Sequence, residues 1–344
     1  LQQVEHFSNP GMTANDSFKP VTKYFDRITR PEQIIQSLPQ AIQTMLDPAD
    51  TGPACLSLCQ DVQGEIFDYP EEFFKERIHN IRRPKPDDFQ IKQAIEKIKK
   101  SKKPIIISGG GVFYSDAMDE LGSFAIKHNI PVTQTVMGYS TMKRDHSHFL
   151  GPIGGLGGRA ANNLAKETDL AICVGTKLAD FTTGSWANFE NPEFKLVSIN
   201  IARHDANKHL AEAVIGDAKV CLSELSNSLG NWKSPDSWHK KSQDELKSWN
   251  EYVDKESGPT NQETPNYAHA VGAIYRNSDP TDIAVTAAGG LVGEVVQVWR
   301  PKELNTHETE WGFSCMSYEI SGALGIKMAN PDKDVIAFVG DGSY

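Results

Sequence analysis

The residues with the clearest potential for chemistry lie near Tyr344, where an apolar segment runs into glycine and aspartate. Residues 335–339 are apolar and are followed by Gly340-Asp341-Gly342-Ser343. A strand that leads into such a turn presents backbone N–H groups to a phosphate, and the Asp341 carboxylate can hold the accompanying cation. The pattern predicts a diphosphate group with a divalent metal. A tight turn in which Asp341 caps a helix explains the same residues and stays open as an alternative.

Asp341 alone would supply only part of a magnesium site. Mg²⁺ prefers six oxygen ligands, and it usually takes one or two from the protein and the rest from phosphate and water. We therefore expect the other protein ligands beyond Tyr344. Because the sequence starts at Leu1 without an initiator methionine and stops inside this motif, we interpret it as the middle part of a longer polypeptide.

Composition argues against several classes of partner. The 344 residues carry a formal net charge of −10 and contain no long stripe of Lys and Arg, which argues against nucleic acid. The apolar runs, such as residues 105–107 and 170–174, are far too short to span a membrane, and no signal-like segment is present. We expect a soluble, cytoplasmic protein of two or three domains.

Cysteine and histidine residues give little sign of a metal centre. The five cysteines are odd in number and scattered, which is typical of reduced core thiols; they are Cys55, Cys59, Cys173, Cys221 and Cys315. The four-residue spacing of the first two lacks a second pair at zinc distance. We interpret His146-Ser147-His148 as a solvated turn and not as a ligand pair.

Helical and strand-like patterns divide the chain into parts. A helical pattern over residues 31–46 precedes a strand at 54–58, and the Pro-rich, charged stretch 82–88 marks a boundary. From residue 89 to 229, helices alternate with strands, which predicts a doubly wound parallel sheet. The predicted strands of that sheet are residues 104–108, 132–135, 170–175 and 196–201.

A charged, Trp-containing segment follows this sheet and predicts one amphipathic connecting helix, which we interpret as a linker and not as a site. A second α/β unit starts after Pro265, with a strand at 282–287 and a helix at 291–298. The predicted domain boundaries are residues 1–85, 86–230, 231–264 and 265–344.

Two further glycine patterns lie in the central part. Gly109-Gly110-Gly111 follows a strand, where a phosphate could bind, but a tight strand-to-helix crossover also needs glycine, and we favour this structural role. Residues 155–160 fit the dinucleotide pattern Gly-x-Gly-x-x-Ala. We interpret this match as a decoy, because the Gly151-Pro152 break leaves no convincing strand before it.

Several segments together resemble the thiamine-diphosphate-dependent acetolactate synthase superfamily. Residues 340–343 resemble its metal–diphosphate signature, and residues 312–329 resemble the segment whose methionine, here Met316, props the cofactor in its bent form. Residues 52–62 and 155–184 resemble parts of its pyrimidine-binding and central domains. The resemblance implies an α/β fold of three domains with doubly wound parallel sheets, of which the first and last are incomplete in this chain.

Within that superfamily, four segments are most similar to the trihydroxycyclohexane-1,2-dione hydrolases of myo-inositol catabolism; they are residues 9–13, 16–23, 287–291 and 307–312. The synthases place polar side chains after the first glycine of the diphosphate domain, whereas this chain has Leu291 and Val292. Phosphate contacts would then come mainly from backbone amides of Gly289 and Gly290. This departure favours a branch outside the synthases.

The resemblance implies thiamine diphosphate and Mg²⁺ as cofactors, with Asp341 as a metal ligand. The carboxylate that activates the cofactor is a Glu expected upstream of Leu1, so no catalytic residue is assigned within the chain. The implied cofactor-binding residues are Gly289, Gly290, Leu291, Ser314, Cys315, Met316, Gly340, Gly342, Ser343 and Tyr344.

The implied reaction is the hydrolysis of the C–C bond between the two carbonyls of a cyclic 1,2-dione, which gives 5-deoxy-glucuronate. In it the cofactor supplies the carbanion chemistry, and the protein supplies geometry and electrostatics. We hypothesise that His307, Glu308 or Glu310 helps with water or substrate hydroxyls, and a solvated acidic loop is the alternative.

Alternative functions stay open. They are an acetolactate synthase-like or 2-keto acid decarboxylase enzyme and a nucleotide-binding regulatory module. The resemblance also implies a homodimer or homotetramer without a membrane or nucleic-acid partner, and we favour an empty nucleotide fold for the central domain.

Overall fold

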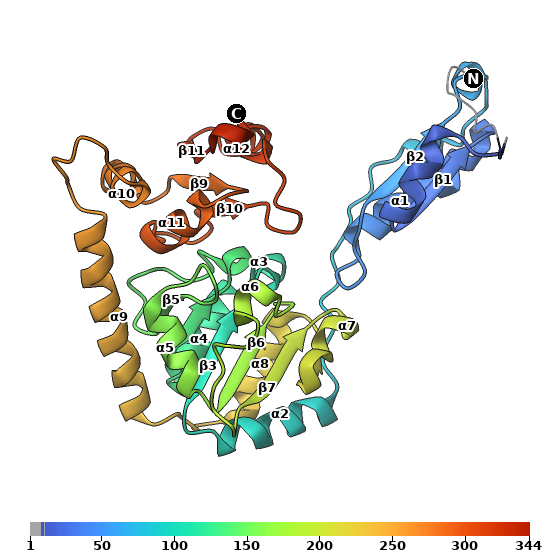
Figure 1. The fold of residues 1–344 in the computed structure, drawn as a ribbon. Helices are drawn as coiled ribbons and strands as arrows, with labels where there is room; N and C mark the ends of the chain where they lie inside the picture. Colours follow the sequence, from blue (N-terminus) through green and yellow to red (C-terminus); the bar gives the residue numbers. More distant parts are fainter. Residues whose placement is uncertain (1–7, 10) are drawn as a thin grey trace. The chain divides into compact units, whose positions relative to one another are not determined.

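The computed structural model describes residues 8–9 and 11–344, and the chain divides into two compact units, Leu1–Arg83 and Pro84–Tyr344 (Figure 1). Residues 1–7 and Pro10 lie outside the described residues, and Pro10 belongs to the first of the four hydrolase-like segments. The predicted domain boundaries remain predictions.

The first unit contains a small parallel sheet. β1 (Tyr24–Ile28) pairs with β2 (Ala54–Leu58), and α1 (Ile34–Leu46) connects them. The predicted strand at 54–58 is confirmed, whereas β1 was not predicted. Short 3₁₀ helices complete the unit: η1 (Ala14–Val21), η2 (Pro31–Gln33), η3 (Val62–Gly64) and η4 (Glu71–Phe74).

A six-stranded parallel sheet forms the central part of the second unit, with strand order β5-β4-β3-β6-β7-β8. The predicted doubly wound sheet is therefore confirmed. Its strands are β3 (Pro104–Ser108), β4 (Val132–Gln134), β5 (Phe149–Pro152), β6 (Leu170–Val174), β7 (Lys195–Asn200) and β8 (Glu212–Ile215). Every residue of β3 and β6 is buried, because helices cover both faces of a parallel sheet.

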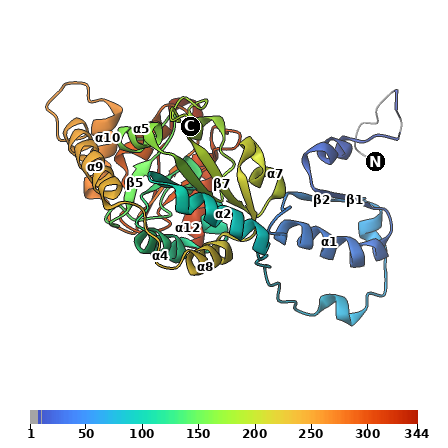
Figure 2. The ribbon, with the colours of Figure 1, turned by 90° about the horizontal axis from the view of Figure 1, so that it is seen from below.

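The helices of this part surround the sheet, and Figure 2 shows α2, α4 and α8 grouped together, with α5 apart from them. They are α2 (Asp88–Lys100), α3 (Gly111–Tyr114), α4 (Met118–His128), α5 (Arg159–Glu167), α6 (Asp180–Thr183), α7 (Arg203–Ala206) and α8 (Ala218–Leu229). Two 3₁₀ helices, η5 (Val136–Gly138) and η6 (Lys208–Leu210), lie between strands.

The prediction that no strand precedes residues 155–160 is wrong. β5 ends at Pro152, shortly before this loop, and is an edge strand that pairs with β4. An edge strand tolerates proline because one of its sides makes no ladder hydrogen bonds. Gly151 has a φ of +90°, which accommodates the register shift in this pairing.

The 21-residue helix α9 (Asp236–Glu256) leads from the central part to the C-terminal part. As predicted, it is amphipathic: Trp238, Leu246 and Trp249 are buried, although Tyr252 is 46% exposed. The Trp238 indole donates to the Pro104 carbonyl over 2.8 Å. The start of the helix is therefore anchored to the central sheet domain.

The C-terminal part is a three-stranded parallel sheet of order β10-β9-β11. Its elements are α10 (Tyr267–Asn277), β9 (Ile283–Thr286), α11 (Leu291–Val298), β10 (His307–Thr309), α12 (Tyr318–Ala329), β11 (Val335–Ala337) and η7 (Asp341–Ser343). The predicted helix at 291–298 and the strand within 282–287 are confirmed. A solvated loop at His307 is wrong, because β10 pairs with β9 and buries this side chain.

Two other expectations about single residues are also wrong. His148 is 6% exposed, because His239 of α9 stacks on its ring with centroids 4.2 Å apart. Cys315 is exposed and Cys55 and Cys59 are half-buried, so only Cys173 and Cys221 are core thiols. Each error has the same source, since burial depends on elements that are distant in the sequence.

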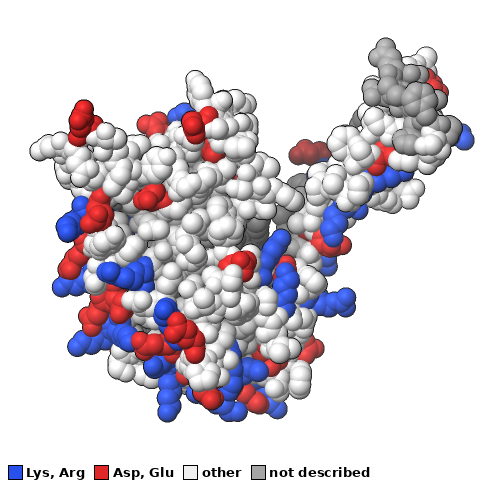
Figure 3. All heavy atoms as spheres, in the orientation of Figure 1, with Lys and Arg blue, Asp and Glu red and all other residues white. Residues whose placement is uncertain are grey.

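The surface carries both signs of charge. On the face drawn in Figure 3, basic and acidic side chains of described residues are interspersed and do not form a stripe of one sign. Among the described residues, no helix combines the length and apolarity that a membrane crossing requires.

Candidate cofactor site

Three turns converge at one edge of the C-terminal sheet. β9, β10 and β11 are parallel neighbours, so the segments that follow them, residues 287–290, 310–316 and 340–343, leave the sheet at the same edge. In open α/β sheets, ligands bind at the carboxyl ends of the strands. These segments contain eight of the ten cofactor-binding residues predicted from the sequence, whereas Leu291 begins α11 and Tyr344 follows the last turn.

Direct contacts join the three turns. The Ser314 hydroxyl lies 3.5 Å from the Ala287 carbonyl oxygen, and the Ser317 hydroxyl donates to the Ser343 carbonyl over 2.8 Å. The Met316 sulfur lies 3.4 Å from the position that a Cβ would take at Gly342. The structure thus brings together turns whose residues are up to 56 positions apart along the sequence, from Ala287 to Ser343.

The glycines of this edge face open space. A Cβ added at Gly289, Gly290 or Gly340 would have no heavy atom of the described residues within 4 Å. Gly289 has a φ of +81°, which L-residues other than glycine rarely adopt, and Gly290 precedes the first turn of α11. Leu291 packs against the core and Val292 is buried, so backbone N–H groups are the polar groups available at this turn. This cradle fits a diphosphate.

Asp341 has the environment of a free ligand and not of a helix cap. Its side chain is exposed, Gly340 occupies the cap position of η7, and among the described residues Asp341 Oδ1 accepts only from the adjacent Gly342 N–H, over 3.0 Å. Asp341 therefore does not cap η7, and the wider capping alternative stays a prediction. Among the described residues no three His, Cys, Asp or Glu side chains are grouped to hold a metal, so a cation here would need phosphate oxygens as additional ligands.

Glu310 shapes the turn that carries Met316. Its two carboxylate oxygens accept hydrogen bonds from the backbone N–H groups of Phe313, over 2.8 Å, and Cys315, over 2.6 Å. These hydrogen bonds hold the pKa of Glu310 below its usual range. Met316 itself is 63% exposed. The Glu310 carboxylate therefore stabilises the conformation of this turn.

Glu308 and His307 have different surroundings. Both line a cavity of about 120 Å³ with Tyr114, Met137 and other residues of the central part. Burial raises the pKa of Glu308, and burial lowers the pKa of His307 to about 4. His307 is held by the Tyr139 ring, 5.4 Å away and edge-on, and by Thr286. His307 and Glu308 thus both combine a place on the cavity wall with a shifted pKa, and Glu308 is the less buried of the two.

Sequence reasoning missed several residues at this site. Tyr114 and Met137 come from the central domain, and no sequence pattern links them to residues 307–309. Glu319 was also missed: it is fully buried, and one oxygen accepts from the Ala288 N–H, over 3.3 Å, and from the Ser343 hydroxyl, over 3.4 Å. An acidic residue inside the apolar run after Met316 was the only available signal.

The glycines of the central sheet are packed differently. A Cβ at Gly109 would lie 2.4 Å from the Gly175 carbonyl oxygen, and one at Gly111 would lie 2.6 Å from the Gly175 Cα. The loop at 155–158 is covered by the C-terminal part, because Leu156 contacts Gly293 of α11 and its carbonyl accepts from the Gln297 amide. These contacts support the structural interpretation of both patterns.

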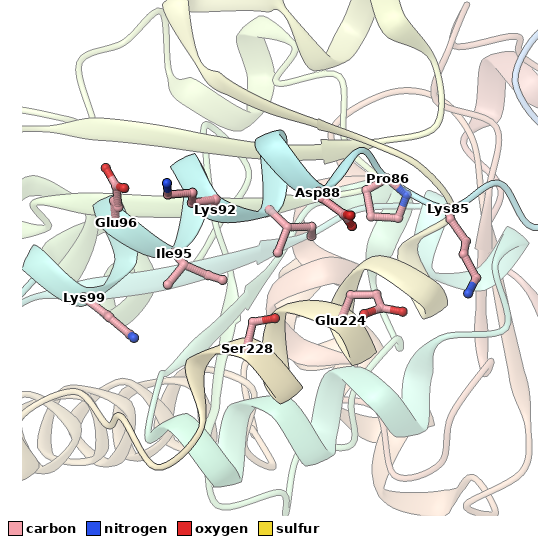
Figure 4. A pocket seen from close by; sticks show the side chains of 10 residues that line it. Lys85, Pro86, Asp88, Lys92, Ile95, Glu96, Lys99, Glu224 and Ser228 are labelled. Atoms are coloured by element: carbon pink, nitrogen blue, oxygen red, sulfur yellow. The ribbon is translucent and has the colours of Figure 1, made fainter.

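A second cavity lies away from this edge. A groove of about 480 Å³ runs between α2 and α8, and Figure 4 shows side chains of both charges along it. Figure 1 places α2 at the end of the second unit opposite to β9, β10 and β11. Mixed, exposed charges and no convergent polar groups give this groove no clear ligand.

Comparison with known families supports the interpretation of the edge. Residues 91–225 match the thiamine pyrophosphate enzyme, central domain, and residues 287–344 match the thiamine pyrophosphate enzyme, C-terminal TPP binding domain. Together the two matches include more than half of the chain. The second match begins at Ala287 and contains all three turns.

Curated relatives align along the whole chain. A protein of Clostridium perfringens strain 13 is 41% identical over 367 aligned residues, and one of Bacillus licheniformis is 40% identical over 375. A protein of Clostridium tetani is 41% identical over 368 residues. All three are named 3D-(3,5/4)-trihydroxycyclohexane-1,2-dione hydrolase.

The alignments include 100% of this chain but only 57% or 58% of each relative. The chain thus spans a little over half the length of the curated relatives that it matches. The sequence resemblance agrees with the two domain matches, with the α/β fold of parallel sheets and with the 40% identity to these relatives. The chain therefore belongs to the thiamine pyrophosphate-dependent enzymes.

Proposed function

We propose that the protein of which this sequence is a part hydrolyses a C–C bond in a cyclic 1,2-dione with thiamine diphosphate and Mg²⁺. The observation that carries the proposal is the open edge, where three turns with exposed glycines and Met316 meet. The names of the relatives give the substrate class, trihydroxycyclohexane-1,2-dione. The reaction would belong to myo-inositol catabolism.

Each group at the edge has a task in this proposal. Backbone N–H groups of the turns at 289–290 and 340–342 would contact the diphosphate, and Asp341 would bind Mg²⁺. Met316 would support the bent cofactor, and Glu310 holds the Met316 turn in shape through Phe313 and Cys315. When bound, thiamine diphosphate supplies a carbon nucleophile and stabilises the charge left when the C–C bond breaks.

The overall chemistry balances with water as the only co-substrate. Water adds to one carbonyl carbon of the dione, and the bond between the two carbonyl carbons breaks. One carbon leaves as a carboxylate, and the other takes up a proton and becomes an aldehyde. The product is 5-deoxy-glucuronate.

Glu308 is our candidate for contact with substrate hydroxyls or water. It lines the cavity of about 120 Å³ beside Tyr114, and burial raises its pKa above the usual range for a carboxyl group. Glu308→Gln should lower kcat/KM for the dione by tenfold or more. Unchanged turnover in this variant would remove Glu308 from the site.

The assay should use the full-length protein. Loss of the dione absorbance and formation of acid are followed with and without thiamine diphosphate and Mg²⁺, with pyruvate as a competing substrate. Cofactor-dependent ring opening without pyruvate consumption is the expected result. Pyruvate consumption would favour the synthase or decarboxylase alternative, and inactivity on both would favour the binding-module alternative. Asp341→Asn serves as the cofactor-site control and should be inactive at low Mg²⁺.

A homodimer or homotetramer belongs to the same proposal. α12 exposes an apolar row, with Ile320, Leu324 and Met328 at 46%, 63% and 76% exposure, and such a row suits a second protein surface. Sedimentation of the full-length protein at two concentrations checks this, and a monomer at both would contradict it. A cytoplasmic setting fits the five unpaired thiols.

A further inference from the structure

α12 buries a single side chain, and that side chain is a carboxylate. Glu319 has no exposed surface, whereas the apolar Ile320, Leu324 and Met328 of the same helix are exposed. A carboxylate without access to water needs hydrogen bonds or a counter-charge to offset its lost hydration. The contacts of Glu319 therefore indicate what this position is for.

One oxygen of Glu319 connects two of the three turns. Oε1 accepts from the backbone N–H of Ala288, which precedes Gly289, and from the hydroxyl of Ser343, which ends the turn at 340–343. The Ser343 carbonyl is also held by the Ser317 hydroxyl, next to the start of α12. The first turn of α12 thus fixes the spacing between the segments that would flank the diphosphate.

The other oxygen is left without a partner. Oε2 is buried, and within residues 8–9 and 11–344 no hydrogen-bond donor reaches it. A buried oxygen of a carboxyl group that lacks a donor is destabilising. A donor that arrives together with a ligand would satisfy it.

The chemistry of the expected ligands indicates which of them could donate a hydrogen bond to Glu319 Oε2. A diphosphate offers only acceptor oxygens and repels a carboxylate, so it cannot satisfy Oε2. A divalent cation such as Mg²⁺ keeps several water ligands, and each of these is a strong donor. Carboxylates that accept hydrogen bonds from the ligands of a metal are a common way to orient them.

We propose that Glu319 is a positioning residue that accepts, through Oε2, a hydrogen bond from a water ligand of the cation at Asp341. The inference rests on the proposed function, because it requires a metal–diphosphate site at this edge. Glu319 then couples the placement of the turns at 287–290 and 340–343 to cation binding. Loss of the Glu319 carboxylate lowers the affinity for the cation more than it lowers the stability of the fold.

The test compares Glu319→Gln with the wild type in the full-length protein. Gln keeps the length of the side chain and one acceptor oxygen but removes the charge. Calorimetric titration with thiamine diphosphate at a series of Mg²⁺ concentrations gives the Mg²⁺ needed for half-maximal affinity. We expect this concentration to rise about tenfold to a hundredfold, while the unfolding temperature of the cofactor-free variant does not fall. Asp334→Asn, an exposed carboxylate of the same domain, is the matched control and should match the wild type.

The outcomes separate the inference from the proposed function. All titrations are made well below the unfolding transition of each variant, so that stability does not enter the result. An unchanged Mg²⁺ requirement in Glu319→Gln overturns the inference, whatever happens to the unfolding temperature. If Glu319→Gln does not fold, Glu319→Asp, which withdraws the oxygens by one methylene, takes its place with the same expected direction. Absence of Mg²⁺-dependent cofactor binding in the wild type would instead contradict the proposed function.

Discussion

The central and C-terminal parts of the second unit use the same local design for opposite purposes. Each has parallel strands that run into glycine-rich turns before a helix. In the central sheet, Gly109 and Gly111 are pressed against the backbone of Gly175. In the C-terminal sheet, an added Cβ at Gly290 or Gly340 would have no neighbour within 4 Å in the part of the chain that the structure describes.

This contrast teaches that glycine after a strand has two distinct meanings. In one case it permits two backbones to approach, which tightens the fold. In the other it leaves backbone N–H groups open to a ligand. The amino-acid sequence does not distinguish these two roles of glycine, whereas the atoms that surround each glycine Cα do.

The largest expected effect would come from crowding the closed turn. Gly109→Ala places a methyl group 2.4 Å from the Gly175 carbonyl oxygen, and 2.6 Å from the Thr176 Cβ. Backbone cannot move aside without disturbing β3 and β6, so we expect the free energy of unfolding to fall by about 3 kcal/mol. Urea unfolding followed by circular dichroism measures this. A change below about 1 kcal/mol would show that the close approach is dispensable.

The second largest expected effect is a loss of stability of the central part at acidic pH. Burial lowers the pKa of His148 to about 4, and the neighbouring His239, His146 and Lys233 act in the same direction. The folded state therefore prefers neutral His148. Its contribution is complete above pH 6.5 and is lost as the pH falls from 6.5 towards 4. We expect about 2 kcal/mol less stability at pH 5 than at pH 7 from this group alone.

The matched variant for this prediction is His148→Phe, which keeps a ring against His239 and removes the titrating group. Its urea midpoint should change less between pH 7 and pH 5 than that of the wild type. His307 of the C-terminal part, whose pKa burial also lowers to about 4, remains in both proteins and contributes to the residual acid sensitivity, together with His128, His146 and His239. Equal pH dependence in both proteins would contradict the assignment to His148.

Crowding the open turn should affect binding instead of folding. Gly340 has a φ of −77° and a ψ of 160°, which alanine adopts without strain, and a Cβ there meets nothing. Gly340→Ala should change the free energy of unfolding by less than about 0.5 kcal/mol. It should lower the affinity for thiamine diphosphate by about tenfold, or about 1.4 kcal/mol of binding free energy, in calorimetric titration. Together, Gly340→Ala and Gly109→Ala test the difference between the open and the closed glycine turns. Loss of stability in both variants would contradict this difference.

The smallest effect concerns the thiols. Cys315 is exposed in the Met316 turn, whereas Cys173 is buried in β6 and burial raises its pKa far above the usual range. A thiol reagent should modify Cys315 and spare Cys173 in the folded protein, and bound cofactor should slow the reaction at Cys315. Peptide mapping after brief labelling checks this. Cys315→Ser should change cofactor affinity by less than about threefold.

Elements with strong local patterns could be predicted from the sequence. α11 begins and ends at the predicted residues, and β2 and β3 do so too, because apolar runs bounded by Gly, Pro and charged residues specify them. The Gly340–Ser343 turn was predicted for the same reason. Its neighbours in space, Gly289 and Met316, were joined to it only through a family resemblance.

Features that depend on distant partners could not be predicted. β10 is three residues long and reads His-Glu-Thr, which has no strand signal until β9 pairs with it. His148 is buried by His239, 91 positions later in the sequence. Glu319 looks like a surface residue of a helix until Ala288 and Ser343 are seen beside it. The sequence carries these contacts only as tertiary information.

α9 has a consequence for how this chain can vary in length. Near its start, Trp238 is anchored to Pro104 of the central sheet; near its end, Asn250 and Asp254 bind the buried Arg300 of the C-terminal part. One inserted residue would turn the far end by about 100° and carry Asp254 away from Arg300, and seven would restore the phase but lengthen the helix by about 10 Å. Insertions and deletions accepted during evolution should therefore be found in the loop at 258–265 and not within the helix.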